Sequence, residues 1–192
     1  MRITIIGNGN VGAGLARTLG RTQHEVSTLG KDDDIGAAVR GADVVVLATP
    51  FDAATDVVGK TDLSGKIIVD VTNPITEDFS GLKVGHETSA AEEIARAAPS
   101  ATVVKAFNTV FAQHYAGDLR LGGVPLQAFI ASDDETARET VKALAAEAGF
   151  EPVDAGPLRN ARYLEPLGFM NIQFGYVLGR GTGIAPRWQA AA

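Results

Sequence analysis

A glycine-rich loop directly after the first apolar segment constrains the fold of this chain more than any other feature. The segment Arg2–Ile6 is apolar and β-branched, and the loop Gly7-Asn8-Gly9-Asn10-Val11-Gly12 follows it at once. A helical stretch, Asn10–Leu19, and a second β-rich run, Glu25–Leu29, come next. A Gly-x-Gly-x-x-Gly loop between a buried strand and a helix, with a second strand beyond, is typical of a βαβ unit that binds a dinucleotide.

Each glycine of this loop has a mechanical reason. Gly7 makes the tight turn, Gly9 lets the pyrophosphate approach the backbone, and Gly12 lets the helix pack on the strand. The free N–H groups at the helix N-terminus favour an anion. We therefore expect a pyrophosphate site made of Gly7, Asn8, Gly9, Asn10, Val11 and Gly12. The alternative is a glycine-rich turn without a ligand.

The rest of the chain alternates short β-rich runs with helical stretches, which predicts a parallel sheet covered by helices. The expected strands are Arg2–Ile6, Glu25–Leu29, Asp43–Leu47, Lys66–Asp70, Thr102–Lys105, Gln127–Ala131 and Glu151–Val153. Their β-branched cores indicate burial on both faces. The predicted fold class is α/β: a Rossmann-like, doubly wound, mostly parallel sheet in three layers. We expect one NAD(P)-binding domain over residues 1–192.

Helix signals refine this outline. Ser89 with Glu92, and Ser132 with Glu135, have the spacing of capping boxes at two helix starts. A long C-terminal helix is expected at about 160–178, kinked or started afresh at Pro166. Residues 109–125 are expected to form a loop with at most a short helix, and residues 32–40 leave little room for a full helix.

Composition excludes several functions. The 192 residues carry a formal net charge of −6 without a Lys/Arg cluster, so nucleic acid and anionic membranes are poor partners. The chain has no cysteine, which excludes disulfides, thiolate catalysis and cysteine-based metal sites. Its three histidines show no metal-ligand spacing, so no metal is expected. No apolar run reaches the length of a membrane span, and we expect a cytoplasmic protein.

The end of the second strand bears on which dinucleotide binds. An acidic side chain there would accept a hydrogen bond from the ribose 2′-OH of NAD. This strand ends instead in Gly30-Lys31, and a lysine pairs with the 2′-phosphate of NADP. Three aspartates, Asp32, Asp33 and Asp34, follow, and one of them could fold back onto a ribose. We favour NADP(H), and NAD stays the alternative.

Ligands of open α/β sheets lie at the carboxyl ends of the strands. Small or polar residues stand at three successive strand ends, which favours a ligand cleft over simple turns. These residues are Thr49, Pro50, Phe51, Asn73, Pro74, Ala106, Phe107 and Asn108. We expect Phe107 to be the one phenylalanine that stacks on a ligand, because it sits at a strand's carboxyl end. Lys105 is expected to be a charged strand end, and contact with an anionic tail of the acceptor is the alternative.

Several motifs together resemble a known family. These are IIGNGNVGAGLA, ATPFDA, VDVTNP, VVKAFNT and DAGPLRNARYLEPLGFM. Over nearly its whole length the chain resembles NADPH-dependent deazaflavin (coenzyme F-420) reductases and related single-domain dinucleotide-binding oxidoreductases. The cytoplasmic domain of metalloreductases, which pass electrons from NADPH through a flavin, belongs to the same group.

The resemblance implies hydride transfer between NADPH and a flat redox acceptor of the deazaflavin or flavin type. It assigns Gly9, Asn10 and Val11 to pyrophosphate, Gly30 and Lys31 to the 2′-phosphate, Thr49 and Pro50 to the nicotinamide side, and Asn73 to its ribose. It assigns Ala106, Phe107 and Asn108 to the nicotinamide and acceptor cleft, with Gly156, Pro157 and Leu158 near the rim. The family pattern has Ser-Arg where this chain has Gly30-Lys31, and often a histidine where it has Asn108.

Two other functions stay open. One is a reductase of imines or hydroxy acids; such enzymes resemble the N-terminal half but add a helical domain that this chain lacks. The other is an NADP(H)-binding sensor module without turnover. The expected partner is a small-molecule redox acceptor, and a homodimer is left open. No convincing acid–base pair stands out, which suits hydride transfer to a flavin-like ring.

Overall fold

The central sheet has five parallel strands, and the sequence predicts the bounds of each to within one residue. They are β1 (Arg2–Ile6), β2 (Glu25–Leu29), β3 (Val44–Leu47), β4 (Ile67–Asp70) and β5 (Thr102–Lys105). The computed structural model describes residues 1–189, so the last three residues of the expected domain, 190–192, lie outside the described residues. The strand order is β2-β1-β3-β4-β5, and every pairing is parallel.

A second, parallel pair of strands extends this sheet in the opposite direction. It consists of β8 (Gln127–Ile130) and β9 (Glu151–Asp154). An antiparallel bridge between Lys105 and Ala131 joins β8 to the end of β5. The sheet is therefore mostly parallel, as the sequence predicts, and the carboxyl end of β8 meets that of β5 at this bridge.

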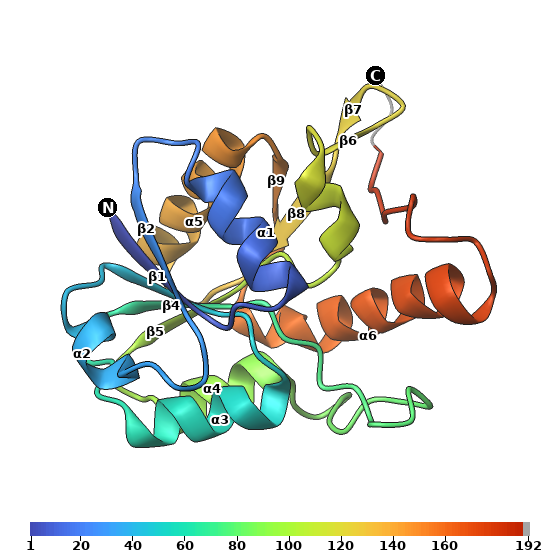
Figure 1. The fold of residues 1–192 in the computed structure, drawn as a ribbon. Helices are drawn as coiled ribbons and strands as arrows, with labels where there is room; N and C mark the ends of the chain where they lie inside the picture. The colour runs from blue at the N-terminus through green and yellow to red at the C-terminus, as the bar shows by residue number, and fades with distance from the viewer. Residues whose placement is uncertain (190–192) are drawn as a thin grey trace.

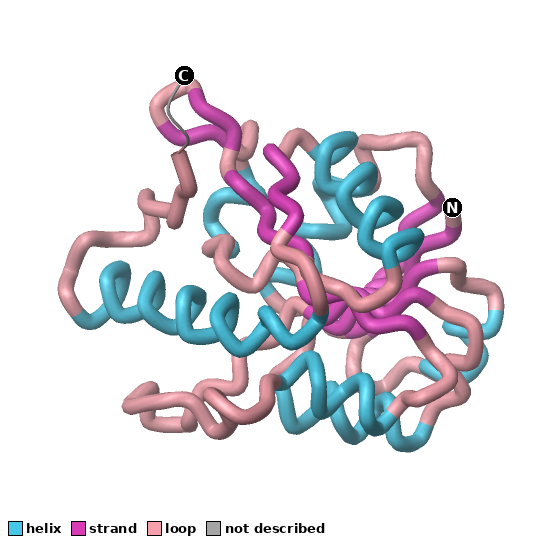
Figure 2. Tube along the Cα trace, turned by 180° about the vertical axis from the view of Figure 1, so that it is seen from behind, coloured by secondary structure: helices cyan, strands magenta, loops and turns pink. Residues whose placement is uncertain are grey.

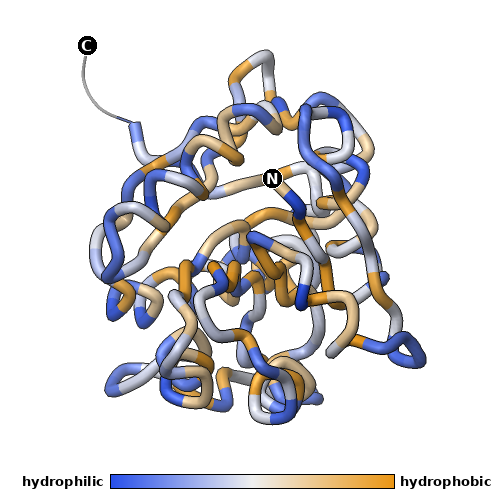
Figure 3. Tube along the Cα trace, turned by 90° about the vertical axis from the view of Figure 1, so that its left-hand side faces the viewer, coloured by the Kyte–Doolittle hydropathy of each residue, from blue (hydrophilic) through white to orange (hydrophobic). Residues whose placement is uncertain are grey.

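Helices cover both faces (Figures 1 and 2). One face carries α1 (Asn10–Leu19) and α5 (Glu135–Ala148), and the other carries α2 (Ile35–Arg40), α3 (Phe51–Lys60) and α4 (Ala90–Ala97). Each face has its own cluster of buried apolar side chains. Hydrophobic residues gather along the central strands and hydrophilic ones mark the outer turns (Figure 3). The predicted Rossmann-like, three-layer α/β fold is confirmed.

The segment 109–125 is more ordered than a loop. It contains a short 3-10 helix, η1 (Ala112–Ala116), and a small antiparallel hairpin of β6 (Arg120–Leu121) and β7 (Val124–Pro125). The sequence prediction missed the hairpin. Gly122 and Gly123 connect its strands with φ angles of 57° and 80°, which glycine adopts without strain.

The C-terminal helix lies where the sequence predicts it, at about residues 160–178. A short 3-10 turn, η2 (Leu158–Asn160), leads into α6 (Ala161–Ile172), which continues as the π-helical turn η3 (Gln173–Val177). Pro166 lies inside α6 and does not end it, so the helix does not start afresh there. Buried residues on both sides of the proline, Leu164 and Gly168, hold the helix against the body of the protein.

One of the two expected serine caps is present, at Ser89. Ser89 accepts a hydrogen bond from the Glu92 backbone N–H and donates to the Glu92 carboxylate. The helix α5 is capped by Asp134 instead of Ser132, because the Ser132 hydroxyl donates to the buried carbonyl of Val103. No helix in residues 1–189 has both the length and the apolar character needed to cross a membrane.

Candidate functional site

A pocket of about 460 Å³ opens at the carboxyl ends of β1, β2 and β3. The chain crosses from one side of β1 to the other between β2 and β3, and ligands of open α/β sheets bind at such a switch point. The lining residues come from the glycine loop, the end of β2, and helices α2 and α3: Ile6, Gly7, Asn8, Gly9, Gly30, Lys31, Ile35, Ala48, Thr49, Pro50, Ala53, Asp56 and Val57. Seven of the expected site residues are therefore brought together here.

The three glycines of the loop differ in what surrounds them. A Cβ on Gly7 would lie 2.3 Å from the Ala48 carbonyl oxygen, and one on Gly12 would lie 1.8 Å from the Gly7 oxygen. Gly7 also has a φ of 112°, which favours glycine. A Cβ on Gly9 would meet no atom within 4 Å. The fold itself therefore requires Gly7 and Gly12, whereas the space beside Gly9 remains for a ligand.

Gly9 is also the N-cap residue of α1, and no side chain caps this helix end. Its orphan backbone N–H groups therefore have no partner from a capping side chain. Free N–H groups and the positive end of the helix dipole together suit a phosphate. This open cradle fits the pyrophosphate of a dinucleotide.

The far end of the pocket is built by the turn after β2. Lys31 is exposed and lines the pocket, where its ammonium can reach an anion. The backbone N–H of Gly30 donates to Asp33 Oδ2 at 2.7 Å. Asp34 caps α2 by accepting from the Ala37 backbone N–H. Thus two of the three aspartates are bound to backbone groups of their own turn.

Sequence reasoning missed the apolar walls of this pocket. Ile35 from α2 and Val57 from α3 both line it. Two apolar side chains on neighbouring helices suit a flat aromatic ring such as adenine. The periodicity of these short helices gave no signal, because it cannot tell which apolar residues face a ligand and which face the core.

Three buried polar atoms at the strand ends have no hydrogen-bond partner among the described residues. They are Thr49 Oγ1 after β3, Thr72 Oγ1 after β4 and Asn108 Oδ1 after β5. Buried polar groups are normally paired, and unpaired ones call for a ligand or water. Thr49 lines the pocket, whereas Thr72 and Asn108 are 4% and 7% exposed and do not line it.

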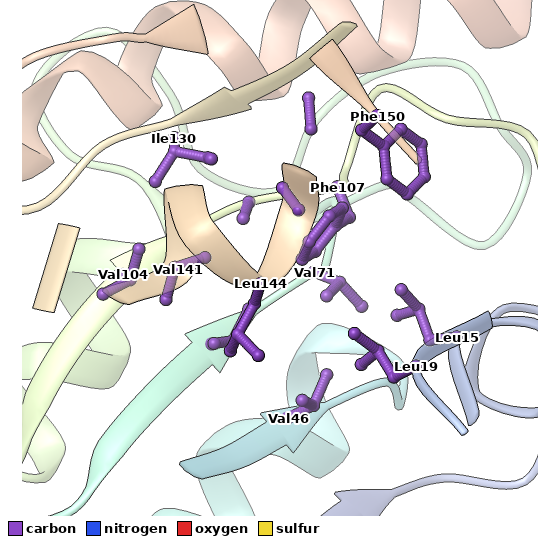
Figure 4. Close-up of a cluster of buried hydrophobic side chains, with 14 of the residues drawn as sticks. Leu15, Leu19, Val46, Val71, Val104, Phe107, Ile130, Val141, Leu144 and Phe150 are labelled. Carbon is purple, nitrogen blue, oxygen red and sulfur yellow. The ribbon is translucent and has the colours of Figure 1, made fainter. Parts of the chain in front are cut away.

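The aromatic ring expected to stack on the acceptor lies in the core. Phe107 is 4% exposed, and its ring centroid lies 5.4 Å from that of Phe150 (Figure 4). Its φ of 61° turns the chain sharply after β5. The expectation of a Phe107 stacking platform is therefore wrong, because the turn directs the side chain inward. Ala106 is likewise fully buried.

Asn73 and Asn108 pair with each other instead of standing free in a cleft. Asn73 Nδ2 donates to the Asn108 carbonyl at 2.8 Å, and Asn108 Nδ2 donates to Asn73 Oδ1 at 2.9 Å. Asn108 Nδ2 also donates to the Leu164 carbonyl in α6. A Cβ on Gly168 would lie 2.8 Å from Asn73 Oδ1, so α6 sits directly on this pair. The amides fix α6 over the strand ends.

The remaining expected residues lie apart from the pocket or at its border. Pro50 lines it as the N-cap of α3, while Phe51 and Pro74 do not line it. Gly156 and Pro157 follow β9, where the Gly156 carbonyl accepts from the Ser132 backbone N–H. Ser132 is next to Ala131, which bridges to Lys105 at the end of β5, so these two residues lie near that strand end. Neither lines the pocket, and their place at the rim of a cleft stays a prediction.

A buried ion cluster lies beneath α6. Lys105 Nζ lies 2.8 Å from Asp70 Oδ2, 2.8 Å from Glu165 Oε1 and 2.6 Å from the Thr72 carbonyl. All three side chains are at most 1% exposed, so Lys105 is the charged strand end that the sequence predicts, but it is buried and paired. Glu165 also accepts from the backbone N–H groups of Ala90 and Ala91 at the start of α4. The cluster ties α6 to α4, β4 and β5.

Burial and charge act against each other in this cluster. Burial favours the neutral amine of Lys105, but Asp70 and Glu165 outweigh it and raise the Lys105 pKa. Burial raises the pKa of Glu165, against the attraction of Lys105. The folded protein therefore favours an ammonium paired with carboxylates, and it resists a second full negative charge beside Asp70.

The comparisons with known proteins bear on the family. Residues 2–74 match the family model described as "NADP oxidoreductase coenzyme F420-dependent". The structure of a candidate F420-dependent NADP-reductase from Arthrobacter sp. FB24 is 28% identical, with a TM-score of 0.83 over 92% of this chain and 94% of that one. This match covers the N-terminal part of the chain, residues 2–74, and agrees with the resemblance that the sequence motifs carry. The family is one of NADP-dependent oxidoreductases, which is the enzyme class that the sequence predicts.

Other relatives extend the comparison. A hypothetical protein from Sinorhizobium meliloti is 29% identical, with a TM-score of 0.72 over 82% of this chain and 86% of that one. Metalloreductase STEAP3 of Rattus norvegicus is 39% identical over 105 residues, which are 55% of this chain and 20% of the relative. The chain thus spans a fifth of the length of that curated relative. An imine reductase from Aspergillus terreus shares the fold at 16% identity and a TM-score of 0.67 over 93% of this chain and 63% of that one.

Proposed function

We propose that the pocket binds NADP(H), and that the chain transfers a hydride between the nicotinamide and a flat acceptor of the deazaflavin or flavin type. The observation that carries the proposal is the open space beside Gly9 at an uncapped helix N-terminus. The family model that matches residues 2–74 and the relative from Arthrobacter both carry F420 and NADP in their descriptions. They support NADP(H) binding and a deazaflavin-type acceptor.

Each part of the chain has a task in this proposal. The N-terminus of α1 holds the pyrophosphate, Lys31 meets the 2′-phosphate, and Ile35 with Val57 encloses the adenine. The hydroxyl of Thr49 orients the nicotinamide end, and the cofactor supplies the hydride when bound. Of the pocket residues, Lys31 and Asp56 are ionisable. Such a site suits hydride transfer, which depends on ring alignment and on exclusion of water.

The direct test is NADPH oxidation followed at its absorbance band, with one acceptor offered at a time. We expect turnover with a deazaflavin or a flavin, and none with cyclic imines. Turnover with ferric chelates or quinones alone would contradict a flavin-type acceptor. Tight NADPH binding without oxidation by any acceptor would identify an NADP(H)-binding sensor module, and turnover with imines would identify a reductase of that class.

Calorimetry tests the choice of dinucleotide. NADPH should bind more tightly than NADH, because the Lys31 ammonium pairs with the extra phosphate. Lys31→Ala should reduce this preference by roughly tenfold, the size of one exposed charge-assisted contact. Equal affinities of the wild type for the two dinucleotides would contradict the assignment of Lys31.

A further inference from the structure

The turn after β2 already holds an anion of its own. The Asp33 carboxylate accepts the Gly30 backbone N–H at 2.7 Å, at the strand end where a dinucleotide places its adenosine ribose. A Cβ on Gly30 would lie 3.7 Å from this carboxylate and 2.9 Å from Asn8 Nδ2. Asn8 and Gly30 both line the pocket. The carboxylate therefore stands at the border of the site proposed for the 2′-phosphate.

The charges around this point are unequal. Lys31 is the basic residue of the turn, and Asp32, Asp33 and Asp34 follow it directly in the sequence. Asp34 is held by α2 as its cap. Asp32 is exposed and has no hydrogen bond or ion pair within residues 1–189. Of the three carboxylates, Asp33 is the one bound to the backbone donor at the strand end.

We propose that Asp33 is a specificity-determining residue that restrains the preference for NADPH. Its carboxylate competes with the 2′-phosphate for the Gly30 N–H and for the positive charge of Lys31. The inference rests on the proposed function, namely that this pocket binds NADP(H).

The competition affects one of the two dinucleotides. A 2′-phosphate carries close to two negative charges at neutral pH, so it must displace Asp33 from Gly30 or bind beside it against charge repulsion. NADH has a hydroxyl at this position and meets neither cost. Asp33 thus lowers the affinity for NADPH and leaves that for NADH nearly unchanged.

The experiment uses the full chain with three variants. Asp33→Asn removes the charge and keeps an acceptor for Gly30, and Asp33→Ala removes both. Asp32→Asn is the matched control, because it deletes an equal charge one residue away that holds no backbone donor. Dissociation constants for NADPH and NADH are measured by calorimetry at low and at high salt, and thermal melts verify that each variant folds.

We expect Asp33→Asn to raise NADPH affinity by about five- to tenfold at low salt, with NADH within about twofold, and Asp33→Ala to raise it at least as much. Added salt should shrink the gain. Asp32→Asn should shift NADPH affinity by no more than about twofold, because a more distant exposed charge is screened.

Three outcomes overturn the inference. An equal gain in Asp32→Asn would make the effect one of net charge rather than of Asp33. A loss of NADH affinity in Asp33→Asn with unchanged NADPH affinity would make Asp33 a ribose ligand. If the wild type binds neither dinucleotide, the proposed function itself fails; if it binds normally and the Asp33 variants are unchanged, this inference alone fails.

Discussion

At the scale of single residues, the glycine loop separates what the fold needs from what a ligand needs. Gly7 and Gly12 have backbone atoms where a side chain would start, and Gly9 does not. Motif spacing alone treats the three as equivalent parts of one pattern. The structure therefore makes Gly9 the position at which binding can be removed without removing the fold.

Gly9→Val tests this separation. We expect the variant to fold, with a loss of about 1 kcal/mol because valine is a poor helix N-cap, and to lose binding of both dinucleotides. Gly59→Val is the matched control, since a Cβ at Gly59 in α3 also meets no atom within 4 Å and this residue does not line the pocket. Circular dichroism and calorimetry measure the two effects. Retained NADPH affinity in Gly9→Val would disprove the placement of the pyrophosphate.

The sequence predicts the place of residues whose role depends on local spacing. It does not predict the surroundings of residues whose contact partners are far away in the sequence. The loop, Gly30 and Lys31 fall in the pocket because a βαβ unit fixes their place within one short segment. In the sequence Lys105 looks like any charged strand end, because its partner Asp70 lies 35 residues away and its partner Glu165 belongs to α6. Phe107 likewise has the sequence position of a cleft residue, but its positive φ directs the side chain inward.

At the scale of elements, α6 is held by polar contacts more than a terminal helix usually is. The Lys105 cluster and the Asn73–Asn108 pair both anchor it to the strand ends. Neither anchor follows from helix periodicity, because both are made by side chains on separate elements. The orientation of α6, and so the space left above the nicotinamide site, depends on these contacts.

Lys105→Met tests the first anchor. Removing the ammonium leaves Asp70 and Glu165 buried without a counter-charge, and we expect a loss of about 3–5 kcal/mol in the free energy of unfolding. Lys60→Met removes the same charge from an exposed i,i+4 pair with Asp56 and should cost less than about 0.5 kcal/mol. Urea titrations of both variants measure the difference. Similar stabilities for the two would show that the buried cluster has no special importance.

Glu165 gives the cluster a pH dependence whose sign is fixed. Its pKa is raised above 4.5 by burial, so the folded state holds this proton more tightly than the unfolded state does. The resulting stability is complete below 4.5 and is lost as pH rises through the folded pKa. As the pH falls from neutrality to 4.5, we therefore expect acidification to stabilise the wild type relative to Glu165→Gln. Parallel stability profiles in this range would contradict the raised pKa.

At the scale of the whole molecule, the nucleotide pocket belongs to the first third of the chain. Its walls come from β1, β2, α2 and α3 with the glycine loop, whereas α5, α6, β8 and β9 complete the opposite end of the sheet. The match to the family model covers the same part, residues 2–74. Cofactor binding should thus be local, and the acceptor side should be formed where α6 overhangs the strand ends.

Hydrogen exchange with and without NADPH tests this division. At a concentration one hundred times its dissociation constant, a ligand that binds the folded state alone adds about 2.7 kcal/mol to stability. For a chain of this size that is a rise of roughly 5–10 °C in melting temperature. Beyond this global effect, we expect added protection in the glycine loop and residues 30–35, and little in β8, β9 or α6. The Gly9→Val variant, which cannot accept the pyrophosphate, should show neither the melting shift nor the local protection. Strong protection centred on α6 with the glycine loop unchanged would move the nucleotide site to the C-terminal half and refute the division.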